Sequence, residues 1–442
     1  MFCGKQVDEI GKECVEEGKY KYKGQVDIPP LSMIDDLISI SECGHKTAMD
    51  HAYIKCKTSS KKLQKCKKIH IGKSHEEHKC QPLYVDKWEE KEVEDCETGI
   101  IKIEDSCESE DVMEEKSEEK YLGDVISRDG RNIKNIQSRV NKGTGIVRKI
   151  LTILDGIPFG KYHFEAGIIL RNSLLVSSVL FNSEAWYNIT KAELELIESV
   201  DLMLLRGILK APKSTPKEML FLELGILPFR EIIRKRRLAF LHYILHENKD
   251  SMISRVFETQ RRNKTSKDWV TTVLSDLKEI NLNMTLEEIR NMKKQTFINI
   301  IKRKIEYKSL KYLEKMKEKH SKVDSLKHPV LKMQPYLMPN DAKMKKEECQ
   351  MIFQMRCRVT DTKVNQKNRY DSHECKACGL TDESQNHVLN CKVIIEMHRE
   401  FEISEIPPYE NIMEGNVNEQ ANICKIFSKN LKILQNLKKK VK

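Results

Sequence analysis

Long apolar runs are absent from this sequence of 442 residues. No uncharged apolar run reaches the roughly 18 residues that a membrane-spanning helix needs, and the best candidate, Ile168 to Tyr187, contains Arg171 and Glu184. The N-terminal stretch lacks the apolar core of a signal peptide. We therefore expect an intracellular protein with no membrane partner. Its fourteen cysteines are expected to be reduced thiols or metal ligands and not a disulfide framework.

The signatures of several large enzyme classes are also missing. The sequence has no nucleophile elbow, no Walker-type phosphate-binding loop and no protein-kinase signature. Gly143-Thr144-Gly145 lacks the preceding strand and the third glycine of a dinucleotide site. Apolar residues make up only 39%, against roughly 45–50% in typical globular proteins. Leu and Ile are abundant enough for a sizeable core, so we expect a folded protein outside these classes.

Outside one acidic segment, positive charge exceeds negative charge over the rest of the chain taken together. Residues 88–120 contain fifteen Asp and Glu and four Lys, a net charge of −11. The whole chain carries +11, so the remainder carries +22. A field of this sign attracts polyanions, of which nucleic acid is the commonest. The alternative is a soluble surface that is simply rich in lysine.

The order of the patterns predicts a mainly α protein with an α+β N-terminal part. Leu31 to Ile40 reads as strand–turn–strand with Asp35-Asp36 at the turn. Residues 88–120 read as an acidic loop and Tyr121 to Ile126 as a strand. Helices are expected at 132–155, 161–187, 190–209, from Thr215-Pro216 to Gly225, and at 229–247 and 344–356. Residues 286–317 read as one long helix or a helix pair, and the tail 419–442 is amphipathic. Thr190 with Glu193 three residues on predicts a capping box at the start of one of them.

Asp35 and Asp36 form the first candidate site. Adjacent carboxylates at a hairpin tip are costly unless they are solvated or neutralised, and Mg²⁺ prefers carboxylate and phosphate oxygens. Two-metal phosphoryl transfer needs such carboxylates at a rigid strand end. The alternative is an ordinary polar turn.

A second candidate site has the spacing Cys375-x2-Cys378-x8-His387-x3-Cys391. Two thiolates two residues apart fit one turn, and Gly379 suits that turn. His387 and Cys391 are expected on one face of a following helix. This ligand set suits a tetrahedral structural Zn²⁺, against the alternative of unliganded thiols. Flanking cations would let such a zinc knuckle sit against nucleic acid: Lys363, Lys367 and Arg369.

The expected helix at 229–247 begins with a cluster of cations. We expect these side chains to contact phosphates of a bound RNA or DNA, with a solvated amphipathic face as the alternative. The cluster consists of Arg230, Arg234, Lys235, Arg236 and Arg237.

Several motifs occur in an order that resembles the reverse transcriptases of non-LTR (LINE-type) retrotransposons. Leu31 to Leu37 looks like the apolar-x-Asp-Asp motif of the palm hairpin. Lys65-Cys66 followed by Ile69 to Gly72 looks like the next palm motif, and Tyr121-Leu122-Gly123 resembles the primer grip. The resemblance implies that Asp35 and Asp36 hold Mg²⁺ and that Lys65 stabilises or protonates the leaving pyrophosphate. Tyr121, Leu122 and Gly123 would hold the primer end.

The resemblance extends through roughly residues 27–395. Its later motifs are Asn182 to Trp186, the stretch from Glu195 and Glu198 to Arg206, and Arg236-Arg237, in a region similar to the thumb. The Cys375 to Cys391 cluster resembles the zinc knuckle of these elements. The implied layout is a polar segment at 1–30, a palm remnant at 31–131 with the acidic insert 88–120, a thumb-like domain at 132–250, a lysine-rich helical connector at 251–360, the knuckle at 361–400 and a basic tail at 401–442.

The pattern also departs from a complete polymerase. Only 34 residues precede Asp35, and none of their acidic residues sits in a convincing apolar strand. We therefore expect a fragment without the fingers and the first palm aspartate, inactive as a polymerase unless another chain supplies the missing palm half. Binding of RNA or DNA through thumb and knuckle is expected to survive. The alternatives are a domesticated or decayed nucleic-acid-binding zinc protein, or a zinc-dependent protein-interaction module. The lysine-rich end slightly favours the nucleus over the cytoplasm.

Overall fold

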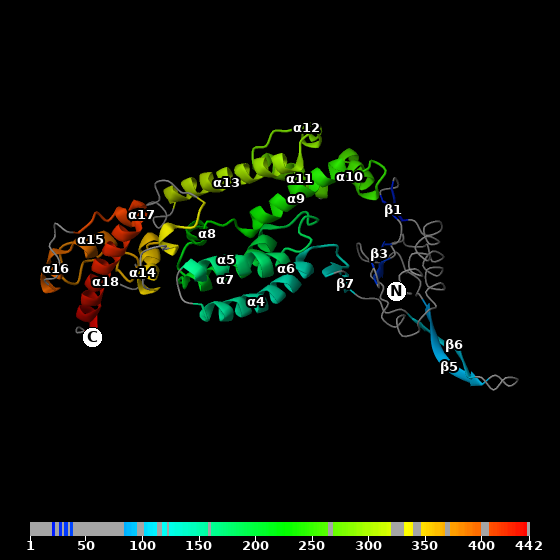
Figure 1. Cartoon of the computed structure of the whole chain (residues 1–442), viewed down its shortest axis with the longest axis horizontal. Coiled ribbons are helices and arrows are strands. Elements are labelled where there is room, and N and C mark those ends of the chain that lie inside the picture. Colours follow the sequence, from blue (N-terminus) through cyan, green and yellow to red (C-terminus); the bar gives the residue numbers. More distant parts are fainter. Residues whose placement is uncertain are drawn as a thin grey trace.

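The computed structural model describes a mainly helical protein whose helices are preceded by paired strands (Figure 1). The mainly α fold class predicted from the sequence is therefore confirmed. Up to residue 112 the description is of the backbone alone. The described residues are 20–22, 26–28, 31–33, 36–38, 84–94, 101–112, 117–121, 123–157, 161–263, 268–319, 331–338, 346–366, 372–398 and 406–439.

The described N-terminal strands form two-stranded antiparallel sheets, which pair β1 with β2, β3 with β4, β5 with β6 and β7 with β8. Met33 lies opposite Asp36, so the two predicted antiparallel strands are confirmed, but Asp36 is the first residue of β4 and not part of the turn. Among the described strands no sheet joins β3–β4 to β7–β8, and the palm remains a proposal. The strands are β1 Tyr20–Tyr22, β2 Val26–Ile28, β3 Leu31–Met33, β4 Asp36–Ile38, β5 Tyr84–Glu94, β6 Ile101–Val112, β7 Glu118–Tyr121 and β8 Asp124–Ser127.

Two N-terminal predictions were wrong. The acidic segment 88–120 is not a loop throughout, because β5 and β6 pair along most of it, with Lys91 opposite Glu104. High acidic content predicted a loop, but backbone pairing satisfies the strand hydrogen bonds whatever the charge of the side chains. The single strand predicted at Tyr121 to Ile126 is two strands, since the chain turns at Gly123 with φ +87° and β8 returns along β7.

The first group of helices follows the predicted boundaries closely. Thr190 and Glu193 form the predicted capping box, in which Thr190 Oγ1 accepts from the Glu193 N–H at 3.2 Å. The helix predicted at 161–187 ends early, because the chain turns after Val179 and Asn182 adopts φ +58°. The elements are α4 Ile133–Asp155, α5 Lys161–Leu170, the π-helical turn η1 Arg171–Val176, α6 Ser177–Val179, α7 Lys191–Leu209, α8 Lys217–Leu224 and α9 Phe229–His246.

Close packing explains Gly143 inside α4 and Gly207 inside α7. A Cβ at Gly143 would lie 2.7 Å from a methyl carbon of Val179 and 2.9 Å from one of Val200. A Cβ at Gly207 would lie 2.4 Å from a methyl carbon of Leu151. Side chains of neighbouring elements therefore pack directly against the helix backbone at these glycines, and Gly143 does not interrupt α4.

A second hydrophobic cluster lies beyond α9. Helix α9 joins the two clusters, because Phe229 and Ile233 belong to the first, whereas Leu238 and Leu241 belong to the second. The first two of the helices that complete this second cluster lie in the predicted helical connector, but their bounds were not predicted from the sequence. These helices are α10 Met252–Asn263, α11 Trp269–Glu279, α12 Leu286–Arg290 and α13 Lys294–Lys319.

The C-terminal helices share the first cluster with α4 to α8. A buried network ties them together, in which Arg356 Nε donates to Glu223 Oε1 at 3.0 Å and the Tyr336 hydroxyl donates to Glu223 Oε2 at 2.8 Å. No helix in the described part of the chain is both long and apolar enough to cross a bilayer. The elements are the 3₁₀ turn η2 Pro335–Leu337, α14 Lys346–Arg356, α15 Gln385–Asn390, α16 Lys392–His398, α17 Asn411–Glu414 and α18 Val417–Lys439.

Candidate metal centre and the basic residues

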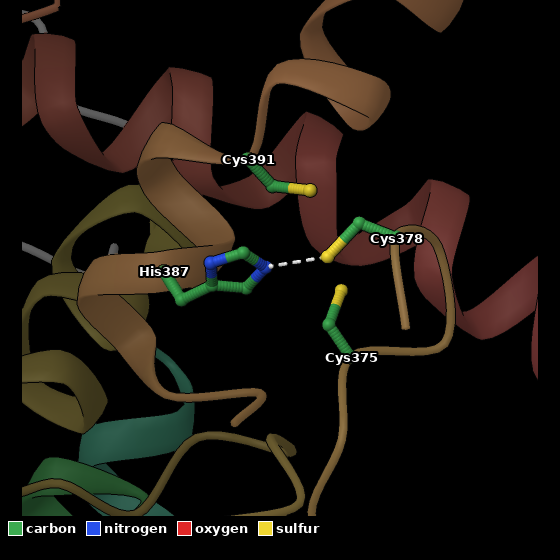
Figure 2. A group of neighbouring side chains, drawn as sticks. All are labelled: Cys375, Cys378, His387 and Cys391. Carbon is green, nitrogen blue, oxygen red and sulfur yellow. Dashed lines mark hydrogen bonds between the residues drawn. The ribbon is translucent and has the colours of Figure 1, made fainter. Parts of the chain in front are cut away.

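Three thiols and one imidazole converge beside α18 (Figure 2). One ligand atom from each residue lies within 4.8 Å of the corresponding atoms of the others. Zn–S bonds of about 2.3 Å in a tetrahedron place thiolates roughly 3.8 Å apart, so little closure is needed around an ion. The predicted ligand set is therefore brought together and could hold a metal ion: Cys375, Cys378, His387 and Cys391.

A tight turn places the first two thiols. The Cys375 N–H donates to the Thr381 carbonyl at 2.7 Å, and the Gly379 N–H donates to the Cys375 carbonyl at 2.8 Å. Gly379 adopts φ +68°, a left-handed conformation that costs glycine little. The predicted role of Gly379 in the turn is therefore confirmed, and Cys378 is held beside Cys375.

Helix α15 places the other two ligands. Ser384 caps this helix by accepting from the His387 N–H at 3.1 Å. His387 Nε2 lies 3.4 Å from the Cys378 sulfur, while its Nδ1 lies 2.9 Å from Thr381 Oγ1. A partner on the second ring nitrogen orients a metal-binding imidazole. Cys391 is the C-cap of α15 with extended backbone, so the prediction that both ligands lie on one helix face was wrong in this detail.

Burial keeps two of the three thiols protonated in the absence of an ion, so a bound metal has to displace their protons. Burial raises the pKa of Cys391 to about 11 and also raises the pKa of Cys375. Burial acts in the same direction on Cys378, but hydrogen bonds from the Leu380 and Thr381 backbone and from neighbouring thiols lower its pKa below the ordinary value. Burial lowers the pKa of His387, which favours the neutral imidazole that binds metals.

The C-terminal helix α18 is fixed to the cluster. Asn430 Nδ2 donates to the carbonyls of Val388 and Leu389 at 2.8 and 3.2 Å. Lys438 Nζ forms an ion pair with the buried Glu383 at 2.7 Å. Folding of the knuckle and docking of α18 are therefore linked through these side-chain contacts.

The predicted flanking cations are only partly described. Lys363 Nζ donates to the Glu374 carbonyl at 2.6 Å, next to Cys375. This contact stabilises the knuckle and occupies one of the ammonium donors. Lys367 and Arg369 lie outside the described residues.

Two of the predicted phosphate-binding cations of α9 are buried in ion pairs within the protein. Arg234 and Arg237 are buried, and both pair with Asp276 of α11, at 3.1 and 2.7 Å from their Nε atoms. Burial alone would lower the pKa of Arg234, but the carboxylates of Glu231, Asp276 and Glu279 raise it above its usual range. The prediction that Arg234 and Arg237 contact phosphates was therefore wrong, because their guanidinium groups hold α9 against α11.

The other cations of the cluster are less enclosed. Arg230 Nε donates to Glu198 Oε1 of α7 at 2.6 Å. Arg236 donates to the Leu180 carbonyl and to Ser183 Oγ, and burial lowers its pKa. Lys235 is half-buried. Two of these three side chains therefore already bind acceptors within the protein.

The thumb-like motifs occupy structural positions. Asn182 Nδ2 donates to Asp124 Oδ2 at 2.6 Å, and Arg139 Nη2 donates to the Gly123 carbonyl at 3.1 Å. These contacts hold the β7–β8 hairpin, which carries the predicted primer grip Tyr121-Leu122-Gly123, against α4. Leu122 and the side chain of Tyr121 lie outside the described residues.

A buried ion pair of the same region joins η1 to α7. Arg171 donates through Nε and Nη2 to the two carboxylate oxygens of Asp201, each at 2.6 Å.

The predicted catalytic residues Asp35 and Lys65 lie outside the described residues. Asp36 is described by its backbone alone, as the first residue of β4.

The solvent-facing side of α4 carries cations that were not predicted from the sequence to form a binding face. Exposed cations lie along it at Lys142, Arg148 and Lys149, with Lys134 near the start of the helix. No Asp or Glu occurs from residue 130 to residue 154. This long gap in acidic residues, in a helix otherwise rich in polar positions, is the signal that could have identified the face.

Comparison of the chain with models of known protein families, with curated proteins and with solved structures found no match.

Proposed function

We propose that this protein binds nucleic acid, that a structural zinc ion holds its C-terminal part together, and that it corresponds to the C-terminal portion of a non-LTR reverse transcriptase. The exposed face of α4 is the observation that carries the binding proposal. Lys142, Arg148 and Lys149 replace the α9 arginines as the phosphate contacts of the thumb-like region, whereas Lys134 pairs with Glu118 at 3.4 Å. The order of the sequence motifs supports the resemblance.

Helical spacing places the α4 cations on a common surface. Lys142 and Lys149 are seven residues apart, about two turns at 3.6 residues per turn, and Arg148 is adjacent to this row. Gly145 lies between them, and apart from the adjacent residues and the backbone of α4 itself, no atom lies within 4 Å of the position that a Cβ would take there. Phosphates can therefore approach the helix backbone between two cations without a steric barrier.

The metal is proposed to be zinc in a structural role. Three sulfur ligands and one imidazole fill a tetrahedron, which leaves no open position for a substrate. In the same proposal, Asp35 and Asp36 hold Mg²⁺ with an aspartate from another chain, and Lys65 faces the pyrophosphate. These palm roles rest on the resemblance alone.

Salt-dependent RNA binding tests the proposal. The zinc-loaded chain is titrated against labelled RNA between about 50 and 200 mM salt, alongside a triple variant of Lys142→Gln, Arg148→Gln and Lys149→Gln. Removing three phosphate contacts should lower the slope of log affinity against log salt by about 2 to 3. A matched variant removes three exposed lysines elsewhere: Lys213, Lys278 and Lys293.

The matched variant should keep most of the slope, because its lysines do not share one face. An equal loss in both triple variants would mean that net charge alone determines binding. No salt-sensitive RNA binding by the wild-type chain would contradict the proposed function and leave the protein-interaction module as the better account.

A further inference from the structure

Helix α13 presents a row of side chains that the core does not use. Phe297, Ile301 and Ile305 face the second hydrophobic cluster and are fully buried. At four-residue intervals on the outer side, the helix instead exposes five polar or aromatic residues, which successive turns place next to one another. The row consists of Asn299, Arg303, Tyr307, Lys311 and Lys315.

Tyr307 is the centre of this row. Its exposed fraction is 61%, although a tyrosine ring is among the side chains that gain most from burial. Arg303 and Lys311 lie one turn away on either side, with a rise of about 6 Å each. The ring is therefore an open aromatic surface between two cations.

The cations of the row differ from their neighbours on the same helix. Lys308 pairs with Glu279 at 2.8 Å, and Lys302 pairs with Glu306 at 3.9 Å. Among the described carboxylates, none forms an ion pair with Arg303, Lys311 or Lys315. Charges of the row thus remain available to an external anion, whereas those beside it are neutralised by the protein.

We infer that the outer row of α13 binds single-stranded nucleic acid, with a base stacked on Tyr307 and phosphates beside Arg303 and Lys311. An aromatic ring flanked by cations is the arrangement that proteins use for unpaired strands, since every base has a face that can stack. A paired base has no free face for an external ring. The inference rests on the proposed function and adds the preferred form of the ligand.

The position of α13 makes this contact separate from the one on α4. Figure 1 shows α13 along the upper edge of the helical body and α4 along the lower edge, with α8 and α9 between them. Sites that share no side chains contribute additively to affinity. Losses from variants on the two helices should therefore multiply in the dissociation constant.

The test compares single-stranded and duplex RNA of equal length on the zinc-loaded full chain. Tyr307→Ala should weaken binding of an unpaired oligouridine by about 5- to 150-fold and leave duplex affinity unchanged. Tyr307→Phe should retain the affinity of the wild type, because the ring is kept. Tyr307→Trp adds a reporter, whose fluorescence should be quenched by the single strand.

Tyr312 provides the matched control on the same helix. Its exposed fraction is 48%, and its hydroxyl donates to Glu218 at 3.4 Å. Tyr312→Ala should leave single-strand affinity unchanged. If wild-type protein binds RNA but Tyr307→Ala binds equally well, or loses single-strand and duplex binding alike, the α13 assignment is wrong and the proposed function stands. If wild-type protein binds neither form, the proposed function itself fails.

Discussion

Replacing Asp276 with asparagine should strongly destabilise the protein. Because a carboxylate does not bind phosphate, this loss would report a structural role and not a binding role. Asp276 is 3% exposed, and it accepts hydrogen bonds from Arg234 and Arg237. Removing one member of a buried ion pair leaves an uncompensated charge and costs about 3–5 kcal/mol. The variant therefore separates a structural role of the α9 arginines from a role in binding.

The magnitude is set mainly by Arg237. Arg234 keeps Glu231 and Glu279 as partners when Asp276 is neutralised. Arg237 is 8% exposed and keeps only the Trp186 carbonyl at 3.4 Å among its described acceptors. A loss of about 4 kcal/mol at a urea dependence of about 3 kcal/mol per molar lowers the midpoint by about 1.3 M.

The assay is urea unfolding followed by circular dichroism and tryptophan fluorescence, with Trp269 reporting on α11 directly. Arg237→Gln should lower the midpoint by a similar amount, since it leaves Asp276 with Arg234 alone. The control Asp250→Asn changes an exposed loop carboxylate and should stay within about 0.5 kcal/mol of wild type. Normal stability of Asp276→Asn and Arg237→Gln, with weaker RNA binding in the latter, would refute the structural assignment.

The remaining predictions concern the two proposed metal sites. Elemental analysis should find one zinc per chain. Cys375→Ser should abolish zinc binding and expose α18 to protease, because α18 is fixed to the knuckle through Asn430. The control Cys349→Ala, at a buried thiol outside the cluster, should keep the zinc. Loss of zinc without any change at α18 would contradict the linkage. Primer extension on an RNA template is expected only when a second chain completes the palm, and Asp35→Asn should then abolish it because the Mg²⁺ clamp loses a ligand. Extension that tolerates Asp35→Asn would exclude the assigned role of that carboxylate.

Structural features whose partner residues are close in the chain were predicted correctly from the sequence. The capping box joins Thr190 to Glu193 across three residues, and a pair of this kind is fully specified by the sequence around it. The knuckle is similar, because Cys375 and Cys378 share one turn and His387 follows on a short capped helix. Such features could be predicted because their partners are close in the chain.

Partners far apart in the sequence were the source of the errors. Asp276 lies 42 residues from Arg234 and 39 from Arg237, and nothing in the spacing of charges reveals that these side chains meet. The arginines of α9 consequently read as a basic face. The acidic segment 88–120 was misread for a related reason, since the pairing of β5 with β6 depends on backbone register and not on net charge.

Several residues of the motifs that carry the resemblance make contacts within the protein. Asn182 holds the β7–β8 hairpin through Asp124, Glu198 pairs with Arg230, and Arg236 donates to Ser183. These residues have structural roles within this chain. Their presence is therefore accounted for by the fold and is no evidence that the chain polymerises nucleotides.

Binding has to be sought where the fold gives no reason for the residues present. The cations on the outer side of α4 lie in a stretch without carboxylates, and Tyr307 of α13 leaves 61% of its surface exposed. Neither feature contributes to a hydrophobic cluster. Substitutions there should cost little stability, whereas those at Asp276 should cost much. RNA affinity measured on both sets of variants therefore distinguishes a surface kept for binding from a core kept for folding.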